Sequence, residues 1–145
     1  MISNVISRLA MCLEYDGSYY HGWQMQKGVV TVQETLEEAV SSVANEEIQV
    51  IAAGRTDAGV HATGQIVHYD TRSNRSSQAW LRGVNSNLPE SVVVSWVLPV
   101  PVTFHARYSA LTRSYRYVLL NRAVRPTYLS PVSYTHLTLP TILLV

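Results

Sequence analysis

One loop, residues 53–65, lies between two β-like segments and reads Ala53-Gly54-Arg55-Thr56-Asp57-Ala58-Gly59-Val60-His61-Ala62-Thr63-Gly64-Gln65. Residues 47–52 before it are rich in β-branched side chains, and residues 65–71 after it alternate between apolar and polar side chains. Both patterns are typical of strands. Because glycine adopts backbone conformations that other residues avoid, the glycines at 54, 59 and 64 indicate a tightly shaped connection. We therefore expect this loop to join the second and third strands of a sheet.

The polar side chains at the centre of this loop allow two interpretations. In the first, the Asp57 carboxylate accepts hydrogen bonds from its own backbone in an Asx turn, and Arg55 is only solvated. In the second, the carboxylate takes part in catalysis, because loops at the ends of strands on a rigid sheet commonly carry catalytic residues. The spacing alone favours neither interpretation.

Two helices are predicted from their capping signals. Thr31 at the N-cap and Glu34 three residues later form a capping box ahead of an amphipathic segment. Ser76 and Ser77 are candidate caps for a second helix, and Pro89 is expected to stop it.

Further strands are predicted on both sides of these helices. Residues 9–15 are apolar and end at a turn signal, and residues 91–97 are dense in β-branched side chains. The order β-α-β-β-α-β predicts an α+β, ferredoxin-like domain with an antiparallel sheet. After a short linker at 99–101, residues 107–110 and 115–121 are expected to add one more strand pair to this sheet.

Composition indicates a single domain inside the cell. At 145 residues and 47% hydrophobic content, the chain can build one sizeable core, and no second domain is expected. No run of about 18 apolar residues is present, so no membrane contact is expected. Cys12 is the single cysteine, which rules out an intrachain disulfide. We expect a cytoplasmic protein.

Charge is distributed unevenly along the chain. Residues 1–54 carry seven acidic residues against Arg8 and Lys27, a net charge of −5, whereas residues 55–145 carry three acidic residues against nine arginines, a net charge of +6. Arginine favours bidentate phosphate contacts and stacking on bases, so the second part is a candidate RNA-contacting surface; ordinary solvated charges are the alternative. Trp23 similarly allows two roles, stacking on an unpaired base or closing the end of the sheet.

Four ordered motifs together resemble one family. The loop motif Gly54-Arg55-Thr56-Asp57-Ala58-Gly59-Val60-His61 with Gly64-Gln65 resembles the signature of TruA-type tRNA pseudouridine synthases. Three further motifs agree in order, so the resemblance extends over roughly residues 9 to 130. They are Glu14-Tyr15-Asp16-Gly17 with Gly22-Trp23-Gln24, then Asn85-Ser86-Asn87-Leu88-Pro89, and then Phe104-His105-Ala106-Arg107 through Tyr115-Arg116-Tyr117. Between Gln24 and Gln26, this chain has Met25 where the family usually has a basic residue.

The resemblance implies an enzyme that isomerises uridine to pseudouridine in the tRNA anticodon stem-loop, at positions 38 to 40. It implies that Asp57 is the nucleophile, that Arg55 holds the extruded base, and that Tyr115 packs against that base. From its strand pattern alone, Tyr115 could equally be an ordinary sheet aromatic. Whether the carboxylate attacks the ribose or the uracil ring stays open. The implied assembly is a homodimer bound to tRNA.

No cofactor and no metal are expected for this reaction. The isomerisation involves no redox change and no external group, so a carboxylate nucleophile suffices. His61 and His68 are seven residues apart and could suggest a metal site with Asp57, but no cysteine or close histidine pair completes a ligand set.

The last part of the chain departs from this pattern. Residues 126–145 contain no Asp, Glu, Lys or Arg, and the resemblance ends near residue 130. We expect residues 1–130 to be the N-terminal catalytic half of a synthase and 131–145 to be an atypical tail, foreign sequence rather than a genuine variant. The chain as written is then expected to be inactive. The alternative function is a non-catalytic ferredoxin-like RNA-binding module, which the fold and the arginines would support equally well.

Overall fold

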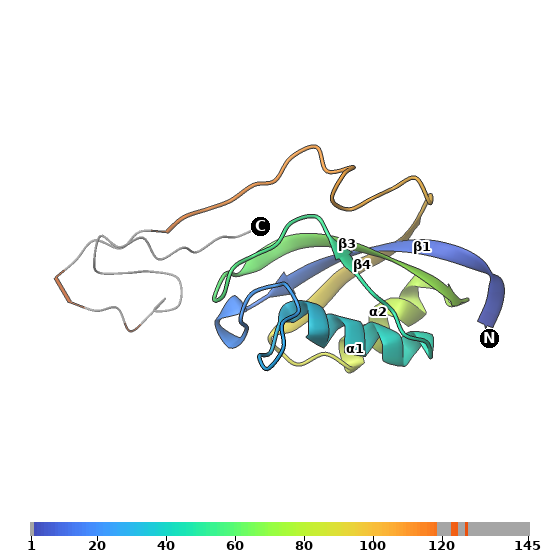
Figure 1. The fold of residues 1–145 in the computed structure, drawn as a ribbon, viewed down its shortest axis with the longest axis horizontal. Coiled ribbons are helices and arrows are strands. Elements are labelled where there is room, and N and C mark those ends of the chain that lie inside the picture. Colours follow the sequence, from blue (N-terminus) through green and yellow to red (C-terminus); the bar gives the residue numbers. More distant parts are fainter. Residues whose placement is uncertain (1, 119–122, 125–126, 128–145) are drawn as a thin grey trace.

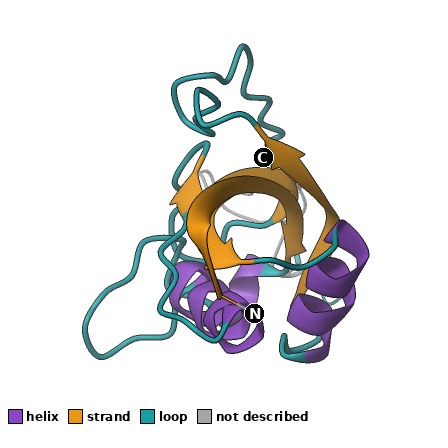
Figure 2. Cartoon of the chain, turned by 90° about the vertical axis from the view of Figure 1, so that its right-hand side faces the viewer, coloured by secondary structure: helices purple, strands orange, loops and turns teal. Residues whose placement is uncertain are grey.

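The computed structural model describes residues 2–118, 123–124 and 127. Its elements are β1 (Ile2–Tyr15), the short 3-10 helix η1 (Gly17–Tyr19), α1 (Val32–Ala44), β2 (Ile51–Ala52), β3 (Ala62–Ser73), α2 (Ser77–Ser86) and β4 (Val92–Val100). The strands form an antiparallel sheet in the order β2-β3-β1-β4. Both helices cover one face of this sheet, and residues 101–118 run along the other side (Figures 1 and 2). The predicted α+β, ferredoxin-like arrangement is confirmed.

The core lies between the sheet and the two helices. On β1, the alternate residues Leu9, Met11, Leu13 and Tyr15 belong to this core. Ala10 and Cys12, which point to the opposite face, are buried as well, so residues 9–13 of this strand are buried on both faces. The two helices pack against the first of these faces with their buried residues, which are Val32, Leu36, Ala39, Val40, Ala44, Trp80 and Val84.

Both helix starts form as the sequence predicts. The Thr31 hydroxyl oxygen accepts a hydrogen bond from the Glu34 amide, and the Ser76 hydroxyl oxygen accepts one from the Ala79 amide. Each hydroxyl satisfies one of the backbone donors that a helix leaves free in its first turn. The second helix ends at Ser86, shortly before Pro89.

The second strand is much shorter than the predicted segment 47–52. Two side chains of α1 hold the residues before it: Glu37 Oε1 accepts from the Val50 amide and Ser41 Oγ from the Ile48 amide, both at 2.9 Å. Ile48 and Val50 are thus bound to the helix, and only Ile51 and Ala52 pair with β3. The pattern of β-branched residues did not reveal these contacts.

The predicted additional strand pair is wrong for the residues that the structure describes. Residues 101–118 contain no strand, and the backbone near 107–110 turns around His105 instead. The His105 carbonyl accepts from the Ser109 amide at 2.7 Å, and its Nδ1 lies 3.2 Å from two further amide donors. These contacts use the donors that a ladder would require. Residues 119–121 of the predicted pair, and the predicted tail 131–145, lie outside the described residues.

The expected linker at 99–101 also begins later than predicted. Strand β4 continues through Pro99 to Val100, and Pro99 pairs with Leu9. Proline has no amide hydrogen, but β4 is an edge strand of this sheet, where a missing donor can face away from the ladder. Among the helices that the structure describes, none has the length and apolar character needed to cross a membrane.

Candidate active site

The loop after β2 is joined to the loop after β1 by backbone contacts. The Trp23 amide donates to the Thr56 carbonyl at 2.9 Å, and the Gly59 amide donates to the Tyr20 carbonyl at 3.3 Å. Gly22 has a φ of 82°, and a Cβ at this position would lie 2.8 Å from the Thr56 carbonyl oxygen. The two loops can approach this closely only because position 22 is a glycine.

A second close approach lies on the other side of the same loop. A Cβ at Gly17 would lie 1.8 Å from the Val60 carbonyl oxygen, so no larger residue fits without moving the backbone. Next to this contact, His61 Nδ1 accepts the Gly17 amide at 3.1 Å. The loop that carries Arg55 and Asp57 is therefore packed against η1 by backbone rather than by flexible side chains.

The two candidate loop residues point outward on either side of a buried one. Arg55 and Asp57 are exposed, whereas Thr56 between them is 5% exposed. The Asp57 carbonyl accepts the Val60 amide at 3.1 Å, which closes a turn over the following residues. Both the Arg55 guanidinium and the Asp57 carboxylate are therefore open to solvent and to a ligand.

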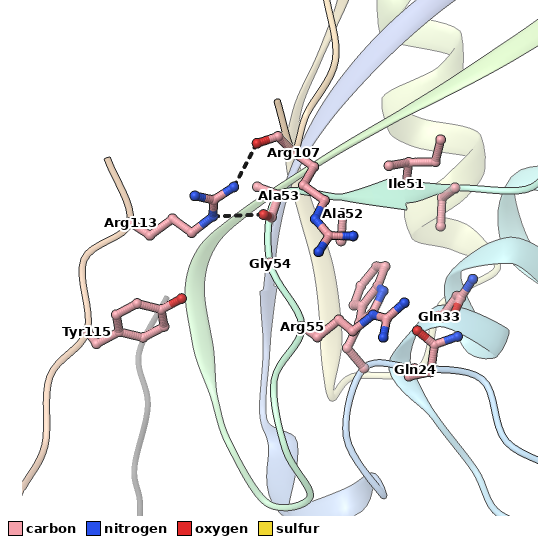
Figure 3. Close-up of a pocket in the computed structure, with 12 residues that line it drawn as sticks. Gln24, Gln33, Ile51, Ala52, Ala53, Gly54, Arg55, Arg107, Arg113 and Tyr115 are labelled. Atoms are coloured by element: carbon pink, nitrogen blue, oxygen red, sulfur yellow. Dashed lines mark hydrogen bonds between the residues drawn. The ribbon is translucent and has the colours of Figure 1, made fainter. Parts of the chain in front are cut away.

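Arg55 and Tyr115 line one pocket of about 480 Å³, although they are 60 positions apart in the sequence. Arg107 and Arg113 also line it, and no acidic residue is found among its described lining residues. Figure 3 shows the Arg55 and Arg107 side chains extending toward the same space, with Tyr115 and Arg113 reaching in from the segment after β4. Asp57 is not part of the pocket lining and lies on the turn beyond Arg55. Cationic side chains without a competing carboxylate suit an anionic ligand such as a nucleotide phosphate.

Arg113 ties the segment after β4 to the start of the loop. Its Nε donates to the Ala53 carbonyl at 2.8 Å and its Nη2 to the Arg107 carbonyl at 2.7 Å (Figure 3). The neighbouring Gly54 carbonyl accepts from Gln65 Nε2 at 2.6 Å. Neither Arg107, although it belongs to one of the quoted motifs, nor Arg113 was predicted as a site residue. The available signal was the excess of arginine over lysine in the basic part of the chain.

A partly exposed ion pair and a buried histidine hold the segment that carries Arg107. The Arg8 guanidinium donates to both Asp70 oxygens, at 2.8 and 2.9 Å, and to the Val102 and Phe104 carbonyls at 2.8 and 2.7 Å. These hydrogen bonds from Arg8 hold the pKa of Asp70 below its usual range. Arg8 is therefore a structural cation.

His68 lies under the same segment, on β3. It is 2% exposed, and its Nδ1 accepts the Ala106 amide at 3.0 Å. Burial, followed by the nearby Arg8 cation and His105, lowers the pKa of His68 to about 4, so the ring is neutral at neutral pH. His61 and His68 thus each use Nδ1 to hold a backbone amide of a different segment. No group of three metal-binding side chains occurs among the residues described here.

Trp23 lies at the end of the sheet and also lines the pocket that contains Arg55 and Tyr115. Its side chain is 3% exposed and packs on Tyr15, with ring centroids 6.4 Å apart. The Tyr15 hydroxyl reaches across to the loop and lies 2.8 Å from Thr56 Oγ1. Sequence reasoning placed Tyr15 only at the end of a strand, because nothing local in the sequence indicates a contact 41 residues away.

Comparison with known proteins agrees with the resemblance described above. Residues 11–109 match a family model described as tRNA pseudouridine synthase. The tRNA pseudouridine synthase A of Aliivibrio salmonicida is 56% identical over 133 residues, which make up 91% of this chain and 51% of that protein. The proteins of the same name from Klebsiella pneumoniae subsp. pneumoniae and Cronobacter sakazakii are 58% and 56% identical, over 86% and 93% of this chain and 46% and 50% of their own lengths. The chain thus spans about half the length of these relatives. It belongs to the tRNA pseudouridine synthase family.

Proposed function

We propose that this chain forms the half of a tRNA pseudouridine synthase that carries the nucleophile, and that the whole enzyme isomerises uridine at positions 38 to 40 of the tRNA anticodon stem-loop. The observation that carries the proposal is the pocket shared by Arg55 and Tyr115, bordered by two further arginines. A stacked base must first be extruded, which costs a few kcal/mol. An arginine-lined pocket beside an aromatic ring can recover this cost through phosphate and stacking contacts.

The reaction rearranges bonds within one nucleoside. The glycosidic C–N bond breaks, the uracil turns, and a C–C bond forms between uracil C5 and the ribose; C5 then loses its proton and N1 gains one. No electrons are gained or lost overall, so no cofactor is required. Asp57 is the proposed nucleophile, since a carboxylate can form and release a covalent adduct. Its exposure next to Arg55 supports this role. Arg55 is proposed to hold the extruded base conformation, and Tyr115 to pack against the target base.

The proposal includes the assembly and the state of the chain alone. A homodimer in the cytoplasm is the proposed form of the whole enzyme, with tRNA crossing both subunits. Residues 1–145 alone are proposed to be inactive, because the pocket is open and catalytic electrostatics depend on a site from which water is excluded. Residues 1–130 are the proposed catalytic half, and 131–145 the proposed tail that is not native to the family.

The test uses a chimera in which the second half of the Aliivibrio salmonicida relative follows the matched residues of this chain. Tritium release from tRNA labelled at uracil C5 reports turnover. We expect the chimera to turn over, and Asp57→Asn to abolish turnover while tRNA binding is kept, because asparagine preserves the shape of the turn but is not a nucleophile. Glu90→Gln is the matched control, since it neutralises another exposed carboxylate. Substantial turnover by Asp57→Asn would refute Asp57 as the nucleophile, and tRNA binding without turnover by the chimera would favour the RNA-binding module.

A further inference from the structure

The Tyr15 side chain makes a buried polar contact with the centre of the loop. Tyr15 ends β1 and is 4% exposed, and its hydroxyl lies 2.8 Å from the hydroxyl of Thr56, which is 5% exposed. Burial raises the pKa of Tyr15, so the phenol keeps its proton at neutral pH and can donate to Thr56. The two buried hydroxyls are costly to separate, because Thr56 would lose the partner of its hydroxyl. The buried Gln65 side chain is a further hydrogen-bond partner of the Tyr15 hydroxyl.

Thr56 is thereby held from two directions. Its hydroxyl is held by Tyr15, and its carbonyl accepts the Trp23 amide at 2.9 Å. Both contacts come from residues at or after the end of β1, a central strand that pairs with both β3 and β4 over residues 8–13 and at Tyr15. Because Thr56 is held in this way, the backbone positions of its exposed neighbours Arg55 and Asp57 are held as well.

We propose that Tyr15 is a positioning residue whose hydroxyl, acting through Thr56, holds Arg55 and Asp57 in the geometry that pseudouridine formation requires. The inference rests on the proposed function. Tyr15 is buried, so it acts on the loop and not on the RNA. Its effect is on the rate of the chemical step, because displacing a catalytic group by about 1 Å can slow a reaction by about 100-fold.

The variants separate the hydroxyl contact from packing. Tyr15→Phe keeps the ring that packs on Trp23 and removes only the hydroxyl. Thr56→Val removes the partner hydroxyl at nearly constant volume, whereas Thr56→Ser keeps it. Tyr20→Phe is the matched control: Tyr20 is also buried, but its hydroxyl pairs with Ser91 Oγ at 2.6 Å.

The first measurement is amide hydrogen exchange in the 145-residue chain. The amides of Trp23 and Val60 bond to Thr56 and Asp57, so they report how firmly the loop is held. In Tyr15→Phe and Thr56→Val we expect both amides to exchange about tenfold faster relative to the paired amides of β1, since a buried hydrogen bond is lost. Thr56→Ser and Tyr20→Phe should leave this ratio unchanged. Equal ratios in Tyr15→Phe and the parent chain would overturn the positioning role.

The second measurement is steady-state turnover in the chimera. We expect Tyr15→Phe and Thr56→Val each to lower kcat by about tenfold or more with KM changed by less than about threefold. The double variant should be no slower than either single variant, because the two hydroxyls act as a unit, and Thr56→Ser should restore kcat. An equal loss of kcat in Tyr20→Phe, or a change in KM alone, would show a general structural effect and overturn the inference. Turnover by Asp57→Asn would refute the proposed function instead, and the exchange ratio would still decide whether Tyr15 holds the loop.

Discussion

Acidification should loosen the segment that carries Arg107, because His68 must stay neutral to hold it. A protonated Nδ1 cannot accept the Ala106 amide, and the cation would lie buried near Arg8. The pKa of His68 is lowered from 6.5 to about 4 in the folded chain. The unfolded chain therefore binds this proton at higher pH than the folded chain does, so stability is lost as the pH falls from about 6.5 to about 4 and is fully present above that window.

The size of this loss follows from the shift. Each pKa unit corresponds to about 1.4 kcal/mol, so the full shift has an upper limit of about 3 kcal/mol, of which about 2 kcal/mol would be lost by pH 5. Relaxation of the protein around a charged ring reduces this loss, so we expect about 1 to 2 kcal/mol at pH 5. His68→Asn is the informative variant, because the asparagine oxygen can accept the Ala106 amide without titrating in this range.

The assay is urea unfolding of the parent chain and His68→Asn, followed by tryptophan fluorescence at pH 7.5, 6.5, 5.5 and 5.0. We expect the parent to lose more free energy of unfolding between pH 7.5 and 5.0 than His68→Asn, by about 1 to 2 kcal/mol. The other histidines are shared by both proteins, so their contributions cancel in this difference. Equal pH dependence in the two proteins would refute the assignment of a buried neutral His68.

Two further substitutions test the loop that carries the candidate site. Gly17→Ala should lower the free energy of unfolding by about 1 to 3 kcal/mol in urea unfolding, because its Cβ would lie 1.8 Å from the Val60 carbonyl oxygen. Gly64→Ala is the control, since its Cβ would meet only Cys12 Sγ, at 4.0 Å. Equal stability of the two variants would contradict the close approach at Gly17. Arg55→Lys should lower turnover of the chimera by about tenfold or more in the tritium assay, because lysine keeps the charge but loses the planar guanidinium, whereas parental rates would remove the proposed role in base extrusion.

Much of the fold and part of the candidate site could be predicted from the sequence because their signals are local. Hydroxyl caps at Thr31 and Ser76 depend on residues three positions away, and the strands around the loop follow from alternation over a few residues. The position of Arg55 and Asp57 on a strand-end loop follows in the same way. Their chemical roles came from the resemblance of the motif and stay proposals.

The tertiary structure alone decided the features that depend on distant partners. Only Ile51 and Ala52 of the predicted strand at 47–52 pair with β3, while side chains of α1 bind the Ile48 and Val50 amides. The predicted pair after β4 is replaced by a turn around His105. The pocket likewise joins Arg55 to Tyr115, and the buried hydroxyl contact joins Tyr15 to Thr56 across 41 residues. Hydrogen-bond donors and acceptors pair with whichever partner the fold brings within about 3 Å, and no local pattern in the sequence records which one that is.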